Sequence, residues 1–194
     1  LPSASIHGLI TEFHELGGEY VSISGGDPVL HPGWRPAVRL TRSLDLPCLL
    51  LTNGTNLSPD DIDFVIETAT SLAVSVEAGS ASAHDAIRGD GAFARTIRAI
   101  EYAAARGYGA RTTLAFTPMS PNWAELPRVV ALARALGVGT VYLSLLERRG
   151  RAAAKFEELE LSESAKEALI FSVWSLQARH PEVAIQCVNL KGFT

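Results

Sequence analysis

Residues 22–28 read Ser-Ile-Ser-Gly-Gly-Asp-Pro, and this stretch decides the fold. The run at residues 20–24 predicts a buried strand, and Gly25 and Gly26 permit positive φ and let a backbone approach a ligand closely. Pro28 fixes φ and lacks the N–H that a sheet needs, so the strand ends before it. Asp27 therefore stands at the mouth of a strand-to-helix turn, which is either an ordinary connection or one side of a ligand site.

The same layout repeats along the chain. Apolar strands alternate with amphipathic helices at regular intervals, and strands that are apolar throughout are typical of a parallel sheet covered by helices. The predicted strands are residues 20–24, 48–51, 72–76, 109–116, 140–145 and 183–188, and the predicted helices are residues 3–16, 34–42, 58–70, 81–87, 93–106, 123–136 and 161–180. The predicted architecture is α/β: a barrel or partial barrel first, a doubly wound open sheet as the alternative.

Composition excludes several classes of protein. The 194 residues are 47% hydrophobic with a formal net charge of −4, an ordinary globular composition without the basic character of a nucleic-acid binder. No apolar run reaches the roughly 18 residues of a transmembrane helix, so no membrane partner is expected. The two cysteines, Cys48 and Cys187, do not make a disulfide framework, which favours a reducing, cytoplasmic location.

Polar residues follow the predicted strands at their carboxyl ends, where parallel α/β folds bind ligands. Each one alone could be a turn or capping residue. As a set on one rim they predict a ligand that offers hydrogen-bond donors, such as an amine or a sugar diol, and the Glu77 carboxylate suits a ribose because it can accept from two hydroxyls. The set is Asp27, Thr52, Asn53, Ser75, Glu77, Thr113, Thr117 and Glu147.

The sequence lacks the residues that several other kinds of catalysis and binding need. Schiff-base catalysis needs a lysine at a strand end, and none of the three lysines falls there. The histidines form no His-x-His or His-Glu-x-x-His pattern, the cysteines form no CxxC pair, and the glycines form neither GxGxxG nor a P-loop. No residue is assigned a catalytic role, and no metal ligand is expected within these residues.

Four motifs, in order, resemble those of radical S-adenosylmethionine (SAM) enzymes. Residues 24–32, Ser-Gly-Gly-Asp-Pro-Val-Leu-His-Pro, resemble the Gly-Gly-Glu-Pro element of that family, and residues 51–55, Leu-Thr-Asn-Gly-Thr, resemble its Thr-Asn-Gly. Residues 74–77, followed by His84-Asp85 and Arg88-Gly89, resemble its fourth-strand segment. Gly-Arg-Ala at residues 150–152 is similar to a loop of the branch with a C-terminal SPASM or twitch extension.

The resemblance implies a partial (β/α)6 TIM-like barrel with SAM across its mouth. By resemblance, residues 25–27 hold the methionine ammonium, and Ser75 and Arg88 hold its carboxylate, where the arginine fork can pair bidentately. Arg88 could instead be a helix C-terminal cation. Glu77 faces the ribose, and residues 143–145 flank the adenine. The full implied cofactor-binding set is Gly25, Gly26, Asp27, Thr52, Asn53, Ser75, Glu77, Arg88 and Leu145.

The chain departs from the family pattern. The CxxxCxxC motif of the first strand, whose thiolates ligate a four-iron four-sulfur (4Fe-4S) cluster, does not occur in these residues. We therefore expect a segment of a longer protein that lacks the first barrel strand, inactive alone, with the cluster ligands upstream of Leu1. Asp27 replaces the common glutamate, and the interval from Ser75 to His84 is one residue longer than usual.

The expected organisation is one core domain over residues 1–194. Barrel strands two to six with their helices occupy residues 1–160, and residues 161–194 form the last helix and the start of a C-terminal extension. Cys187 is expected to be a buried structural cysteine rather than a ligand of an auxiliary cluster. The basic loop at residues 148–151 is either solvated or in contact with a peptide or anionic substrate.

The function implied by the resemblance is hydrogen abstraction from a substrate by a 5′-deoxyadenosyl radical generated from SAM, and the Gly-Arg-Ala element points to a peptide or protein substrate. Two alternatives remain open at this point. One is a degenerate module of the same fold that binds SAM or a peptide without redox chemistry. The other is an unrelated α/β-barrel enzyme that uses rim carboxylates as acid and base.

Overall fold

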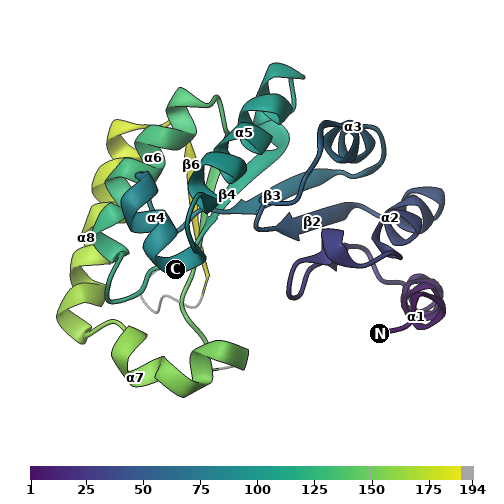
Figure 1. The fold of residues 1–194 in the computed structure, drawn as a ribbon, viewed down its shortest axis with the longest axis horizontal. Helices are drawn as coiled ribbons and strands as arrows, with labels where there is room; N and C mark the ends of the chain where they lie inside the picture. The colour runs from purple at the N-terminus through teal and green to yellow at the C-terminus, as the bar shows by residue number, and fades with distance from the viewer. Residues whose placement is uncertain (149, 189–194) are drawn as a thin grey trace.

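The computed structural model describes residues 1–148 and 150–188. Its six strands form one parallel sheet in the order β1-β2-β3-β4-β5-β6 (Figure 1). The strands are β1 Val21–Ile23, β2 Cys48–Thr52, β3 Ser71–Ser75, β4 Thr112–Phe116, β5 Thr140–Ser144 and β6 Ala184–Val188. The α-helices are α1 Ser3–Glu15, α2 Trp34–Ser43, α3 Pro59–Thr68, α4 Ala81–Arg88, α5 Ala92–Ala105, α6 Leu126–Ala135, α7 Phe156–Leu159 and α8 Glu163–Arg179.

The sequential strand order decides between the two predicted architectures. A doubly wound sheet reverses its order at a switch point and carries helices on both faces, whereas a barrel adds each strand beside the previous one. Here every strand pairs in parallel with its neighbour in sequence. Helices α2, α3, α5, α6 and α8 contact the strands from the outer face of the curved sheet (Figure 1). The fold is therefore the predicted partial TIM-like barrel.

Alternate strand residues point to the helices and build the core. Leu50, Leu72, Leu114 and Leu143 stand on successive strands and are completely buried against the helices. Cys48 belongs to the same buried layer. Cys187 of β6 packs against this layer but is only half-buried, so it is less buried than expected, and its structural role stays a prediction. Burial raises the pKa of the Cys187 thiol to about 11, so little of it is thiolate at neutral pH.

The N-terminus of α3 shows how local sequence sets an element boundary. The Ser58 hydroxyl accepts from the Asp61 N–H at 3.1 Å, and the Asp61 carboxylate accepts from the Ser58 N–H at 3.0 Å. This is a capping box, with Pro59 in the first helical position. The predicted start of the helix is confirmed because these contacts satisfy amide groups that the helix itself cannot pair.

We expect Ser58→Ala to lower the free energy of unfolding by about 0.5–2 kcal/mol, because the Asp61 amide loses its acceptor. Ser58→Asn is the control, since asparagine caps equally well. Urea unfolding of both variants measures the difference, and equal loss in the two would show that the cap is not the cause.

Two predicted boundaries were wrong. The strand expected at residues 109–116 begins only at Thr112, after a 3-10 turn at Gly109–Arg111. A Cβ at Gly109 would lie 2.3 Å from the Gly137 oxygen, so this backbone runs against the next loop instead of extending. The helix expected from residue 123 starts with a 3-10 turn, Trp123–Glu125, before α6.

The expected basic loop at residues 148–151 is partly helical. Residue 149 lies outside the described residues, and a 3-10 helix, Gly150–Lys155, leads directly into α7. Arg148 pairs with Glu157 of α7, and its guanidinium lies 5.4 Å from the centre of the Phe156 ring. These contacts, which join residues eight and nine positions apart, hold Arg148 against α7.

The end of the described chain continues the sheet. Strand β6 pairs with β5 in parallel from Thr140↔Ala184 to Ser144↔Val188. Residues 189–194, part of the predicted C-terminal extension, lie outside the described residues, so where an extension begins stays a prediction. Among the residues that the structure describes, no helix has the length and apolar character needed to cross a bilayer.

Candidate functional site

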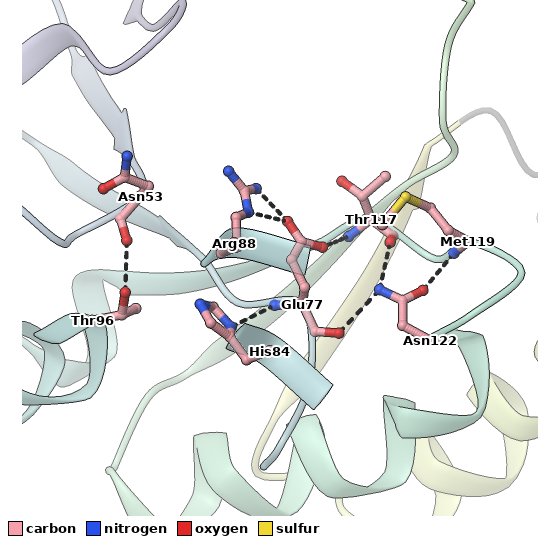
Figure 2. Close-up of polar contacts among 8 residues, drawn as sticks. All are labelled: Asn53, Glu77, His84, Arg88, Thr96, Thr117, Met119 and Asn122. Carbon is pink, nitrogen blue, oxygen red and sulfur yellow. Dashed lines mark hydrogen bonds and ion pairs between the residues drawn. The ribbon is translucent and has the colours of Figure 1, made fainter. Parts of the chain in front are cut away.

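Glu77 is the most deeply buried acidic residue at the rim, with 2% of its surface exposed. It follows β3 by two residues. Arg88, the last residue of α4, donates from both Nε, at 3.1 Å, and Nη2 to the Glu77 Oε1 (Figure 2). The second oxygen, Oε2, accepts from the Thr117 N–H at 3.4 Å. A buried carboxylate needs such partners, because an unpaired charge in this position would cost several kcal/mol.

Asn122 ties the ends of two strands together behind this ion pair. Its Nδ2 donates to the Glu77 carbonyl at 3.0 Å and to the Thr117 carbonyl at 3.1 Å, and its Oδ1 accepts from the Met119 N–H at 2.6 Å (Figure 2). Only 2% of Asn122 is exposed. The loops after β3 and β4 are thereby held at a fixed separation, which sets where the Glu77 carboxylate lies.

His84 supports the same loop from α4. The ring is 1% exposed, and its Nδ1 accepts from the Glu77 N–H at 3.2 Å, which requires the unprotonated nitrogen. Burial, reinforced by the nearby Arg88 cation and partly opposed by Asp85, lowers the pKa of His84 below its usual 6.5. The neutral form is thus the one that fits the folded protein.

This lowered pKa predicts a pH dependence of stability. Below about pH 6.5 the unfolded chain takes up a proton that folded His84 resists, so the stabilisation is complete above that pH and is lost as the pH falls through the lower folded pKa. We expect urea unfolding to show a larger loss of stability between pH 7.5 and 5.5 for the wild type than for His84→Asn, whose amide oxygen can accept the same hydrogen bond. Equal losses would contradict the assignment.

The ion pair opens onto a cavity. Glu77, Arg88 and Thr117 line a cavity of about 620 Å³. The other walls include side chains from the loop after β5, from the 3-10 helix Gly150–Lys155 and from α7. The Arg88 Nη1 forms no hydrogen bond with any residue in the described ranges, so it is free to bind an anionic group (Figure 2). The cavity therefore presents a buried carboxylate and an available guanidinium nitrogen on one wall.

A second cluster surrounds Asp27 at the tips of β1 and β2. Thr52 donates its hydroxyl to Asp27 Oδ1 at 2.6 Å, and Asn56 donates to Oδ2 at 3.1 Å. Gly25 and Gly26 have φ of 104° and 32°, and both are exposed. A Cβ at either glycine would meet no atom within 4 Å, so the turn needs glycine for its backbone angles and leaves open space beside it.

The remaining predicted residues bond within their own turn, pack against the core or face the inner side of the sheet. The Asn53 side chain accepts from Thr55 within its own turn, and its carbonyl accepts from the Thr96 hydroxyl at 2.9 Å (Figure 2). Leu145 packs against the core beyond β5. Ser75, Thr113 and Thr117 face a cavity on the inner side of the sheet.

The structure therefore joins Asp27 with Thr52, and Glu77 with Arg88 and Thr117, as two separate hydrogen-bonded groups. The cofactor roles of the predicted residues stay predictions. Sequence reasoning missed the parts that His84 and Asn122 play in holding Glu77. The one available signal was an asparagine directly after the proline-rich turn at residues 118–121, which is typical of a turn-forming side chain.

No group of three or more His, Cys, Asp or Glu side chains is placed to hold a metal ion anywhere in residues 1–148 and 150–188. The two cysteines of the sequence are both free. The residues present therefore do not fit a 4Fe-4S cluster.

The comparisons with known proteins agree with these features. The chain is 28% identical over 162 residues to mycofactocin maturase MftC of Mycobacterium ulcerans, which covers 83% of this chain and 43% of that protein. It is 28% identical over 163 residues to the AdoMet-dependent heme synthase of Oleidesulfovibrio alaskensis, covering 83% and 42%. The crystal structure of Streptococcus suis SuiB bound to S-adenosylmethionine superposes with a TM-score of 0.80 at 10% identity, covering 98% of this chain and 44% of SuiB, a likeness of fold.

The chain thus spans less than half the length of these relatives. The model of the radical SAM superfamily matches residues 2–133, more than half of the chain, which include the Asp27 turn and the Glu77–Arg88 pair. Together with the sequential parallel sheet, this match shows that the chain belongs to the radical SAM superfamily.

Proposed function

We propose that the protein containing these residues is a radical SAM enzyme that modifies a peptide or protein in the reducing cytoplasm. The observation that carries the proposal is the Glu77–Arg88 pair, which faces a cavity at the rim of a radical SAM barrel. Mycofactocin maturase is among the relatives, and SuiB has also been solved bound to its precursor peptide, which supports a peptide as the substrate class.

The residues of this chain have defined tasks in the proposal. The carbonyl groups of the Gly25–Gly26 turn accept from the methionine ammonium, and the Arg88 Nη1 and the Ser75 hydroxyl bind the carboxylate. The Glu77 carboxylate accepts from the ribose hydroxyls, competing with the Thr117 N–H for Oε2. These residues would hold SAM, which on receiving one electron from the cluster would supply a 5′-deoxyadenosyl radical for hydrogen abstraction, with methionine as the leaving group.

We propose that the 4Fe-4S cluster is held by residues outside these 194, because the sequence has only Cys48 and Cys187, both in or beside the core. This chain's contribution is then to bind SAM, orient it and shield the site from water. Helix α7 and the 3-10 helix before it line the same cavity and can exclude solvent there.

The test uses the full-length protein, prepared anaerobically and reconstituted with iron and sulfide. Reduction with dithionite in the presence of SAM is expected to release 5′-deoxyadenosine, measured by liquid chromatography. Binding of SAM to a filled cluster without cleavage would instead indicate a binding module. Turnover in air without iron would indicate an acid–base enzyme, so either result rejects the proposal.

A further inference from the structure

Arg88 lies where a helix end is ordinarily free to fray. It is the last residue of α4, and the next residue, Gly89, has a φ of 97°. Gly91, two residues further on, has a φ of 69° and directly precedes α5. Because glycine can adopt many other backbone angles, a turn with two glycines does not fix its own shape. The position of the Arg88 guanidinium therefore depends on contacts that hold this turn.

The Asp85 carboxylate makes two such contacts. Its Oδ2 accepts from the Gly91 N–H at 2.9 Å, and its Oδ1 accepts from the Phe93 N–H at 2.7 Å. Both amides lie at the N-terminus of α5, where the N-cap residue is a glycine and has no side chain to accept a hydrogen bond. Asp85 therefore caps α5 from the preceding helix. The Phe93 N–H contributes most to a pKa of Asp85 below its usual value, so the carboxylate stays ionised at neutral pH.

His84, the residue before Asp85, holds the other side of α4. Its Nδ1 accepts from the Glu77 N–H at 3.2 Å, and its ring packs edge-on against the ring of Phe93, with the ring centres 5.6 Å apart. Phe93 is thus held through its N–H by Asp85 and through its ring by His84. The end of α4 that carries Arg88 is therefore fixed to the loop after β3 on one side and to α5 on the other.

We propose that Asp85 is a positioning residue that presents the Arg88 guanidinium to the methionine carboxylate of SAM. No hydrogen bond or ion pair joins Asp85 to Arg88 within residues 1–148 and 150–188, so Asp85 acts through the glycine turn. Arg88 Nε and Nη2 are held by Glu77, and a shift of the turn would move the remaining nitrogen away from the ligand. The inference rests on the proposed function for the identity of the ligand.

The test compares SAM with decarboxylated SAM, which lacks the carboxylate and keeps the amine and the nucleoside. Each is titrated into the full-length, cluster-loaded, unreduced protein, and its dissociation constant is measured by equilibrium dialysis. Because a charge-assisted hydrogen bond is lost, we expect Asp85→Ala to weaken SAM binding at least about tenfold, and Asp85→Asn, which keeps one acceptor oxygen, to weaken it less. Decarboxylated SAM should bind the wild type and both variants within about twofold of one another. Unchanged SAM binding, or an equal loss for both ligands, overturns the inference.

Two control variants separate positioning from lost charge and from a lost helix cap. Asp90→Asn removes a carboxylate charge at an exposed position of the same turn. Ser58→Ala removes the cap of α3 and leaves the Asp85 contacts in place. Both controls are expected to bind SAM as tightly as the wild type. A loss of SAM affinity in either control as large as that of Asp85→Ala shows that the effect is not specific to Asp85.

Amide hydrogen exchange gives a readout that needs no ligand. In Asp85→Ala the Gly91 and Phe93 N–H groups lose their acceptor, so peptides that span residues 89–93 should exchange faster than in Ser58→Ala, measured by mass spectrometry. If Asp85→Ala does not fold, Asp85→Asn provides the same comparison. Unchanged exchange in this turn would show that the carboxylate does not hold it, which refutes the positioning role.

The two proposals fail separately. A protein that releases 5′-deoxyadenosine, but whose preference for SAM over decarboxylated SAM is the same in the wild type and in Asp85→Ala, refutes the positioning role and leaves the radical SAM function standing. A protein in which Asp85→Ala lowers that preference, but which never cleaves SAM, refutes the proposed function and leaves the role of Asp85 standing.

Discussion

Arg88→Ala is expected to lower the free energy of unfolding by about 3–5 kcal/mol, because it leaves the Glu77 carboxylate buried without its cation. Arg88 itself is about one third exposed, so solvent screens its charge and the lower end of this range is the expectation. Denaturant unfolding measures the change. Weaker SAM binding should accompany it, since the same guanidinium is proposed to hold the methionine carboxylate.

The Glu77→Gln, Arg88→Ala double variant separates the charge effect from lost packing. Neutralising Glu77 removes the unpaired charge, so the double variant should be more stable than Arg88→Ala alone. Arg88→Lys keeps the charge but not the fork that donates twice to one oxygen, and should fall between the wild type and Arg88→Ala. A double variant no more stable than Arg88→Ala would show that Glu77 does not need Arg88.

The positions of the strands and helices could be predicted because hydrophobic periodicity and helix caps depend on neighbouring residues. Every strand and helix on the outer face was predicted, since periodicity and caps such as Ser58 act within a few residues. The βα alternation predicted parallel strands but left two strand orders open, that of a barrel and that of a doubly wound sheet, and the structure shows the sequential order of the barrel. The errors fall at residues 109–111, 123–125 and 148–157. At Gly109 the backbone of Gly137, 28 residues further along the chain, overrides the local pattern.

The site was predicted as a set of residues but not as an arrangement. Strand-end position pointed to Glu77 and family resemblance to both Glu77 and Arg88, yet their pairing joins the residue two positions after β3 to the last residue of α4, a contact between elements that periodicity within one element does not reveal. Asn122 is 45 residues from Glu77 and became visible only when the fold brought the ends of β3 and β4 together. Tertiary contacts of this kind depend on the whole sheet and leave no mark in local sequence.

Asn122→Ala is expected to reduce the free energy of unfolding by at least about 3 kcal/mol, because it leaves the Met119 N–H and the Glu77 and Thr117 carbonyls without their partner, at about 1–3 kcal/mol for each unsatisfied group. Asn56→Ala is the matched control, since Asn56 is exposed and its loss of one bond to Asp27 can be replaced by water. Its effect should stay within about 0.5 kcal/mol.

Asn122 makes no contact with the cavity that Glu77 and Arg88 line, so any effect on the cofactor must pass through the Glu77 loop. In the reconstituted full-length protein we therefore expect Asn122→Ala to weaken SAM binding by roughly tenfold at a temperature where the variant is still folded. Asn122→Ser, which can restore part of the hydrogen bonding, should recover part of that affinity. A variant that loses stability yet binds SAM as tightly as the wild type would show that Asn122 only supports the fold, and that the position of Glu77 does not depend on it.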